Sequence, residues 1–125
     1  MSAEGNIRML YLQTFGRVPG NNSVIANQAN VWRNRIKKFV NEGNSQEQAQ
    51  KKTRDIFLSD YRNSAEYANR PQIIKNAYRT FLGREPSQAE LSQQNSRGTA
   101  TDKIVQSIAG SAEAKAFTRN FAAYT

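Results

Sequence analysis

The sequence predicts an all-α protein: a single compact domain of six to eight helices, built from two related helical units. Three observations favour this fold class. Apolar residues recur at helical spacing in several segments, no segment alternates apolar and polar residues over a useful length, and one helical segment occurs twice. We expect one domain over residues 1–125, with unit one at about 3–69 and unit two at about 70–125.

The duplicated segment is the clearest feature of the chain. Residues 7–19, IRMLYLQTFGRVP, align without a gap with residues 74–86, IKNAYRTFLGREP, at an offset of 67 positions (74 − 7). Both copies keep Ile, Tyr, Gly, Arg and Pro in register. In each copy the apolar residues fall on one helix face, Gly supplies the left-handed conformation that ends a helix, and Pro prevents the helix from resuming.

The two Gly-Arg-x-Pro turns are predicted to be structural stops. They comprise Gly16, Arg17, Pro19, Gly83, Arg84 and Pro86. The arginine in each turn is expected to bond the unpaired carbonyls of the preceding helix or to reach a carboxylate in the next helix. Contact of this arginine with a ligand or a partner is the alternative.

Unit one is expected to begin with a helix over about residues 3–15, followed by a loop rich in Gly, Pro and Asn at 16–22. A second helix is predicted over about residues 23–41, because its apolar residues recur at near-heptad spacing. Those residues are Ile25, Ala29, Trp32, Ile36, Phe39 and Val40. Gly43 is in position to end this helix.

A third helix is predicted to begin after Ser45, since Ser45 and Gln48 form the Ser-x-x-Gln pattern of a capping box. Its expected core residues are Ala49, Thr53, Ile56, Phe57 and Tyr61. The helix is expected to break near residues 59–63, and Ser64 then caps a short helix that runs through Tyr67.

Unit two is predicted to begin near residues 69–71 with the repeated helix, which runs to Leu82. Ser87 and Glu90 form a second capping box, which opens a short polar helix ending at residues 96–98.

The last two helices are expected to begin at Thr99 or Thr101 and at Ser111. Their expected core residues are Ile104, Val105, Ile108, Ala109, Ala114, Phe117 and Phe121. Neither unit can bury its apolar face alone, so we expect the two units to pack face to face. Unit one holds 20 more residues than unit two between its Arg and its closing Ser (64 − 17 against 111 − 84), and such insertions often mark a binding face.

The repeated turn also carries a resemblance to known families. A tyrosine-bearing helix that ends in Phe/Leu-Gly-Arg-x-Pro resembles the phycobilisome rod-linker domain of cyanobacteria, and equally a bacterial repeat of unknown function with the same turn. Both tend to close the unit with Ser-x-Glu-aromatic, which here is Ser64-Ala65-Glu66-Tyr67. In unit two, Ser111-Ala112-Glu113 is followed by Ala114 in place of the aromatic residue.

Unit one matches the second family further through Trp32 and Gly43-Asn44-Ser45, which have no counterpart in unit two. The resemblance implies a linker-like domain that holds other protein subunits. For the rod linkers these subunits are phycobiliproteins, which are acidic and would suit a basic chain. The chain has no second adaptor domain, which many rod linkers carry.

Composition restricts the chemistry that this chain can perform. With no His and no Cys, the sequence excludes Cys-His and Ser-His-Asp catalysis and thiolate metal sites, and no phosphate-binding or dinucleotide motif is present. Asp55 with Asp60 or Glu66 is the remaining candidate for acid–base catalysis, although such carboxylates on a basic protein are more often ion-pair partners. We therefore expect no enzymatic activity, no cofactor and no metal.

A net charge of +8 and a pI near 10.1 suit acidic proteins, nucleic acid or anionic lipid as partners. The basic residues concentrate in one part of unit one. They are Arg33, Arg35, Lys37, Lys38, Lys51, Lys52 and Arg54. Because Arg33 and Lys37 are one turn apart, and Lys51 and Arg54 are three apart, two adjacent helices could present one cationic face for a partner. The alternative is that these residues are only the solvated sides of amphipathic helices.

These observations predict a non-catalytic assembly, scaffold or accessory structural protein. It would bind protein subunits of a larger complex, expected to be acidic, such as phycobiliproteins or the subunits of a virus particle. The alternative is a sequence-independent nucleic-acid-binding protein, which the charge alone supports. No apolar run can span a membrane and residues 1–6 do not resemble a secretory signal, so we expect no membrane insertion and favour the cytoplasm or a particle assembled there.

Overall fold

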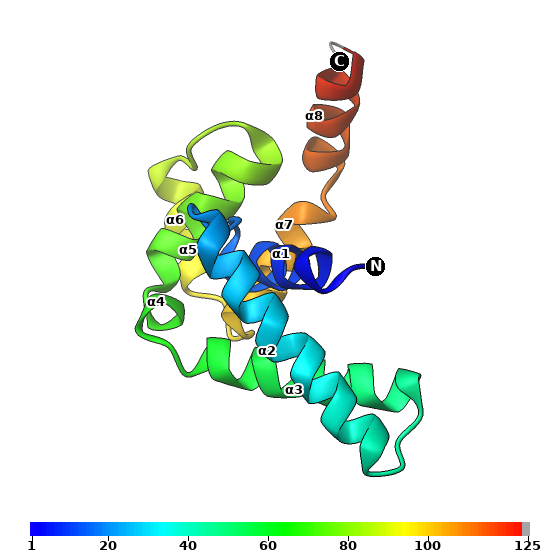
Figure 1. The fold of residues 1–125 in the computed structure, drawn as a ribbon. Helices are drawn as coiled ribbons and strands as arrows, with labels where there is room; N and C mark the ends of the chain where they lie inside the picture. Colours follow the sequence, from blue (N-terminus) through cyan, green and yellow to red (C-terminus); the bar gives the residue numbers. More distant parts are fainter. Residues whose placement is uncertain (124–125) are drawn as a thin grey trace.

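The computed structural model describes the backbone of residues 1–123 and the side chains of residues 1–117 (Figure 1). Within this part of the chain every regular element is helical, which confirms the predicted all-α fold of six to eight α-helices. The helices are α1 (Ala3–Phe15), α2 (Asn22–Asn41), α3 (Gln46–Arg62), α4 (Ala65–Ala68), α5 (Arg70–Ala77), α6 (Gln88–Asn95), α7 (Thr101–Ala109) and α8 (Ala112–Ala123). A π-helical segment, η1 (Tyr78–Leu82), continues α5. The expected core residue Phe121 lies outside the described side chains.

Local sequence signals set the helix starts as predicted. Ser45 and Ser87 both begin their helices with complete capping boxes, in which the serine hydroxyl accepts from the third residue of the helix and that residue's side chain accepts from the serine N–H. Ser64 caps α4, and its hydroxyl accepts a hydrogen bond from the Tyr67 N–H at 3.2 Å. α7 begins at Thr101, one of the two expected starts.

The repeated helix of unit two differs from its prediction. The α-helical hydrogen bonding ends at Ala77, and the remaining turn is π-helical rather than α-helical. Two side chains from this region bond the last carbonyls of α1. Asn76 Nδ2 donates to the Phe15 carbonyl at 3.3 Å, and Thr80 Oγ1 donates to the Gly16 carbonyl at 2.6 Å. The π-helical turn thus occurs where side chains of unit two bond the end of the first helix of unit one.

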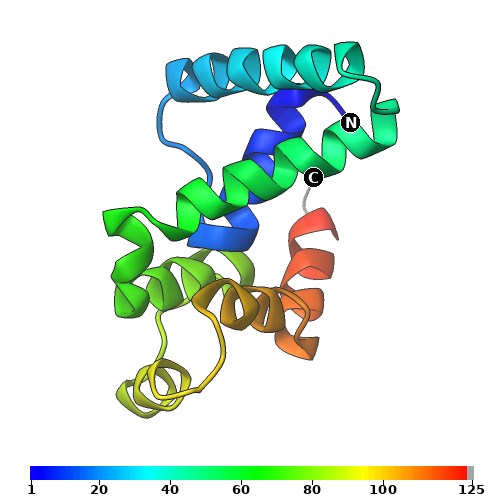
Figure 2. The same ribbon diagram turned by 90° about the horizontal axis from the view of Figure 1, so that it is seen from below.

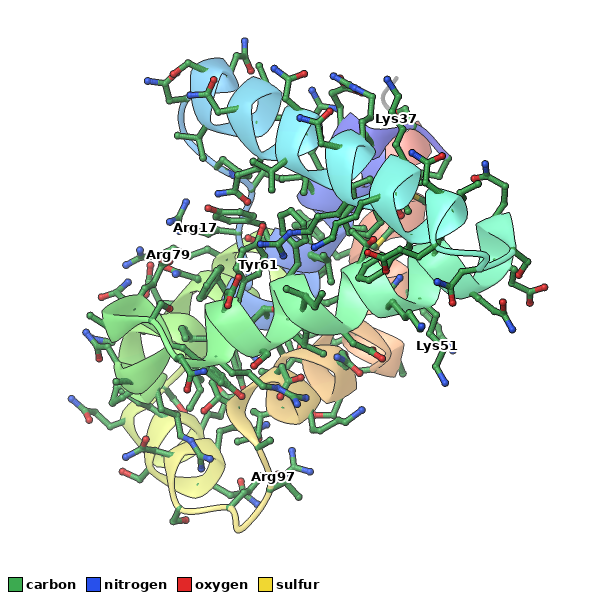
Figure 3. The ribbon with its side chains drawn as sticks, turned by 60° about the horizontal axis from the view of Figure 1, so that its bottom comes forward. Arg17, Lys37, Lys51, Tyr61, Arg79 and Arg97 are labelled. Carbon is green, nitrogen blue, oxygen red and sulfur yellow. The ribbon has the colours of Figure 1, made fainter. Side chains whose placement is uncertain are left out.

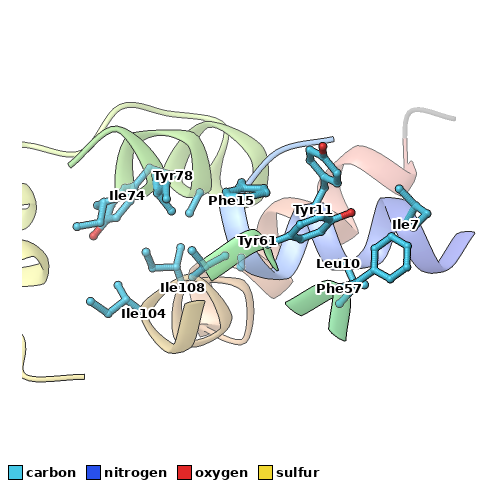
Figure 4. Packing of buried hydrophobic residues seen from close by; sticks show 14 of the residues in the cluster. Ile7, Leu10, Tyr11, Phe15, Phe57, Tyr61, Ile74, Tyr78, Ile104 and Ile108 are labelled. Atoms are coloured by element: carbon cyan, nitrogen blue, oxygen red, sulfur yellow. The ribbon is translucent and has the colours of Figure 1, made fainter. Parts of the chain in front are cut away.

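α1 lies at the centre of the fold and packs against α2 and α3 on one side and α5 and α7 on the other (Figures 1 and 2). The buried side chains of both units form one cluster (Figure 4). Ile7 of α1, Ile73 and Ile74 of α5 and Ile104 of α7 have no exposed surface. Each such side chain stabilises the fold by about 1.5–3 kcal/mol. Side chains of the two units are therefore buried against each other in one shared core.

Both Gly-Arg turns require glycine for their backbone. Gly16 and Gly83 have φ values of 70° and 67°, in the left-handed region that other residues adopt only with strain. The space around both is also occupied. A Cβ on Gly16 would lie 2.8 Å from the backbone nitrogen of Ala77, and one on Gly83 would lie 2.7 Å from Cζ of Phe117. Each glycine thus ends its helix and allows a close contact, which for Gly16 is with Ala77 of α5 and for Gly83 is with Phe117 of α8.

The α2–α3 hairpin, residues 22–62, extends to one side of the shared core (Figure 1). Its turn, at residues 42–45, lies at the outer end of the hairpin (Figure 1). Trp32 and Phe57 pack against each other within the hairpin, with ring centroids 5.2 Å apart. No described helix is long and apolar enough to cross a membrane. The extra length of unit one relative to unit two is therefore used to build a projecting arm.

Candidate functional site

The arm carries all seven basic residues that the sequence singled out, and it separates them into two groups. Four of them border a set of hollows on the side where α1 packs. These four are Arg33 and Lys37 on α2, and Lys51 and Arg54 on α3. Figure 3 shows Lys37 and Lys51 extending outward from the two helices of the arm. They are the same two pairs that the helical spacing placed on a common face.

The other three basic residues line none of these hollows. Arg35 lies over the ring of Phe57 at 5.4 Å, and the ammonium of Lys52 lies 5.6 Å from the ring of Phe39. These contacts are typical of cation–π interactions, worth about 0.5–1 kcal/mol at exposed sites. Lys38 is exposed. The seven residues predicted to bind a partner therefore lie on more than one side of the hairpin, because residues 37 and 38, like 51 and 52, point about 100° apart on their helices.

Three neighbouring hollows lie on this side of the hairpin. The first has a volume of about 320 Å³, and its lining includes Trp32, Ile36, Arg33 and Lys37. The second, of about 200 Å³, shares Trp32 with the first and adds two residues of α3. A third hollow of about 240 Å³ shares Arg54 with the second and extends to α7. Residues of both α1 and α3 line each of these three hollows, and we call them together the α1–α3 groove. Across the seam between the two helices, Arg54 Nη2 donates to Gln13 Oε1 at 2.9 Å.

Two regular series of side chains define the α1–α3 groove. On α3 five lining residues recur every four positions, and they are Gln46, Gln50, Arg54, Leu58 and Arg62, while Lys51 lies beside this series. On α1 four lining residues recur every three or four positions, and they are Ala3, Asn6, Leu10 and Gln13, while Thr14 lies beside them. Residues at these spacings lie in a row along one side of a helix. The groove therefore follows the seam between α1 and α3 from the arm to α7.

The groove is strongly cationic. Its lining contains six basic side chains, which are Arg33, Lys37, Lys51, Arg54, Arg62 and Lys103. The single carboxylate among the lining residues is that of Asp102, whose side chain is only 2% exposed. Arg33 is partly neutralised by Glu4, with Nη1 and Oε1 2.8 Å apart. Among the residues that the structure describes, no salt bridge involves Lys37, Lys51 or Lys103.

Asp102 fixes the far end of the groove. Its carboxylate accepts from Arg62 Nη2 at 2.6 Å and from the Tyr67 hydroxyl at 2.8 Å, and the Tyr67 hydroxyl accepts from the Asp102 N–H. Burial favours the neutral form of this carboxyl, but the hydrogen bonds from Arg62 and Tyr67 outweigh burial, so the pKa of Asp102 is below its ordinary value. Asp102 is thus an internal counter-ion that leaves little negative charge facing the groove.

The arginine of the first Gly-Arg turn reaches a carboxylate, but that carboxylate lies on α4 and not, as predicted, on the next helix, α2. Arg17 donates from Nε and Nη2 to the two oxygens of Glu66, both at 2.7 Å, and its guanidinium lies over the ring of Tyr11 at 5.4 Å. Glu66 belongs to the Ser-Ala-Glu segment that closes unit one. The Tyr, the Gly-Arg turn and the closing Glu of the sequence pattern are therefore one contact cluster in space.

The second unit repeats this cluster. Arg84 donates to both oxygens of Glu113, at 2.7 and 3.0 Å, and lies 5.2 Å from the ring centroid of Tyr78. It also donates to both oxygens of Glu90, each at 2.8 Å. These hydrogen bonds from Arg84 lower the pKa of Glu90 to about 2. The matching contacts in the two units indicate a structural role for both turns.

The acidic residues considered for catalysis do not form a site. Glu66 is held by Arg17, while Asp55 and Asp60 are exposed on α3. Asp55 borders a further hollow of about 410 Å³, which is lined by α3 and the residue after it and shares Leu58 and Arg62 with the third hollow of the groove. Within the described part of the chain, no three acidic side chains gather in a way that could hold a metal ion.

Sequence reasoning missed two cationic members of the groove, Arg62 and Lys103. Arg62 continues the series of every fourth residue from Gln46 through Arg54, so the spacing along α3 contained a usable signal. Lys103 lies in unit two, and only the packing of α7 against α1 brings it to the groove.

Comparison with known proteins adds no relative to this description. No protein-family model, no curated protein and no solved structure matches the chain.

Proposed function

We propose that this protein is a non-catalytic assembly module that holds acidic protein subunits of a larger complex against the α1–α3 groove. The observation that supports the proposal is the charge of the groove. Six basic side chains line it against one carboxylate, which is already paired internally. Charges arranged in this way favour acidic partners and speed their association.

The apolar part of the groove favours a protein partner over one that binds through charge alone. Met1, Ala3 and Ile36 provide accessible apolar surface at one end, beside the buried Trp32, and amide side chains from Asn6, Gln46 and Gln50 lie next to them. Protein interfaces combine an apolar centre with a polar and charged rim in this way. Phycobiliproteins, which the resemblance to rod linkers implies, and the subunits of a virus particle are both candidate partners.

The lack of His and Cys supports a binding role rather than a catalytic one. The acidic residues that remained as catalytic candidates are dispersed, since Glu66 pairs with Arg17 and Asp60 lies exposed on α3. We propose no cofactor for this chain.

Nucleic acid remains the second candidate, favoured by the net charge of +8. Proteins that bind single strands without sequence preference stack bases on accessible aromatic rings. The aromatic residue of the groove, Trp32, is only 4% exposed. The groove therefore suits an acidic protein better than a single strand.

A native pull-down at low salt, with and without nuclease, tests the proposal. The tagged protein is incubated with an extract of the cells that produce it, and the retained proteins are identified by mass spectrometry. We expect stoichiometric acidic proteins that survive nuclease treatment and are released as salt rises. Retention that disappears with nuclease would contradict the proposal and favour nucleic acid.

A further inference from the structure

We infer that the occupant of the α1–α3 groove is a linear acidic segment of a partner protein, bound in an extended conformation and carrying one apolar anchor residue. This inference rests on the proposed function and specifies the chemistry of the partner. It follows from the length of the groove, from the distribution of its charges, and from the position of its apolar lining.

The length of the groove fits a short peptide. The α3 series runs from Gln46 to Arg62, which is 16 residues (62 − 46) along the helix. At a rise of about 1.5 Å per residue this series is about 24 Å long. An extended chain rises about 3.3 Å per residue, so about seven residues would span the groove.

The charges are spread along that length rather than gathered at one point. Lys37 lies at the arm, Lys51 and Arg54 lie in the middle, and Arg62 and Lys103 lie at the α7 end. A single small anion would contact only one of these groups. A segment with carboxylates at most of its positions meets all of them in turn, and each contact contributes most at low ionic strength.

The apolar anchor belongs at the arm. Met1 and Ile36 line the first hollow, whose volume of about 320 Å³ is the largest of the three. The third hollow, beside α7, is bordered mainly by polar and charged groups, and of its two leucines Leu10 is buried and Leu58 is half-buried. An aromatic side chain near one end of the segment therefore finds its larger apolar surface at the arm.

Fluorescence anisotropy with labelled peptides tests this inference. The probe is a capped heptapeptide of six glutamates with phenylalanine at the second position. We compare it with the same peptide carrying serine in place of phenylalanine, with a four-residue version, with a lysine-for-glutamate version, and with a seven-nucleotide oligothymidylate. We expect the heptapeptide to bind more tightly than all four, and the lysine version not to bind.

Two double variants locate the binding. The groove pair, Lys37→Gln with Lys51→Gln, removes two exposed charges from the groove, and the outer pair, Lys38→Gln with Lys52→Gln, removes two exposed charges from outside it. Loss of two exposed charge contacts of about 0.5–1 kcal/mol each corresponds to weakening of about 5- to 30-fold. We expect this weakening for the groove pair and almost none for the outer pair.

The single variant Lys103→Gln tests the length of the site. Lys103 is exposed and lies at the α7 end, so its loss should weaken the heptapeptide but leave the four-residue peptide, anchored at the arm, unchanged. Circular dichroism confirms that each variant remains helical.

Several outcomes would overturn the inference. They are equal weakening by both lysine pairs, indifference to peptide length or to the phenylalanine, and tighter binding of the oligothymidylate than of the peptide. If no peptide binds, but the groove-pair variant loses a folded acidic partner that the parent protein retains, the proposed function stands and the linear segment is rejected. If the groove-pair variant retains that folded partner as well as the parent protein does, the proposed function and the linear segment are both rejected.

Discussion

Replacement of Gly16 by Ala is the sharpest test of how the two units are joined. Gly16 has φ of 70°, and a Cβ there would lie 2.8 Å from the backbone nitrogen and 3.0 Å from Cα of Ala77. The left-handed conformation costs a residue with a Cβ about 1–2 kcal/mol. The clash adds about 1–3 kcal/mol, because a helix backbone cannot move aside as a flexible side chain can. We therefore expect Gly16→Ala to lower the free energy of unfolding by about 2–5 kcal/mol.

Gly43→Ala is the matched control for this experiment. Gly43 has φ of 99°, but a Cβ there would meet nothing within 4 Å. This variant should lose only the conformational part, about 1–2 kcal/mol. Urea unfolding followed by circular dichroism at 222 nm gives both free energies. If Gly16→Ala costs no more than Gly43→Ala, the tight packing of the first Gly-Arg turn against α5 is refuted.

Three further predictions concern the polar contacts. A double-mutant cycle of Arg17→Gln and Glu66→Gln, measured by urea unfolding, should give a coupling of about 0.5–1 kcal/mol, since the pair is bidentate but more than a third exposed; no coupling would contradict the contact. In the same assay, Asp102→Asn should destabilise the protein by about 2–3 kcal/mol, because two charge-assisted hydrogen bonds to a buried carboxylate are weakened. A variant as stable as the parent would show that these two bonds do not stabilise the fold. Arg84 lowers the folded-state pKa of Glu90 to about 2, below its ordinary value of 4.5. The contribution of ionised Glu90 to the free energy of unfolding is therefore complete above about pH 4.5 and is lost as the pH falls towards 2. Glu90→Gln should accordingly flatten the fall in urea midpoint between about pH 5 and pH 2, and an unchanged pH profile would refute the assignment.

The helix boundaries were largely predictable because their signals are local. Ser45 and Ser87 carry their capping partners three residues on, so the chain alone specifies where α3 and α6 begin. Gly16 and Gly83 end their helices for the same reason. The π-helical turn was not predictable, because it accompanies the bonds of Asn76 and Thr80 to the end of α1, which lies more than 60 residues away along the chain (76 − 15 and 80 − 16).

The repeated motif was predictable as a pattern but not as a set of contacts. The sequence places Arg17 and Glu66 in recurring positions, yet their separation of 49 residues hides the ion pair that joins them. The bond of Arg84 to Glu90 agrees with the predicted contact to a carboxylate in the next helix, whereas its bond to Glu113, 29 residues away, depends on the fold. The signal that the sequence did contain was the recurrence of the turn arginine and the closing glutamate in both units, as Arg17 with Glu66 and Arg84 with Glu113.

The groove was predictable only in part. Spacing alone pairs Arg33 with Lys37 and separates them from Lys38, because neighbouring residues on a helix point about 100° apart. Which of these sides faces α1 depends on the burial of Trp32, which requires the packing of the whole arm. The contribution of Lys103 depends on unit two and had no signal in unit one.

We propose that the α1–α3 groove, and not basic charge in general, holds an acidic protein partner. The decisive quantity is the affinity of the nuclease-resistant partner for variants in the two lysine pairs, measured by anisotropy or calorimetry at low salt. We expect Lys37→Gln with Lys51→Gln to weaken binding by about 5- to 30-fold. We expect Lys38→Gln with Lys52→Gln, which changes the net charge equally, to leave binding unchanged. Equal weakening by both pairs would refute the proposed groove, because the partner would then be responding to overall charge.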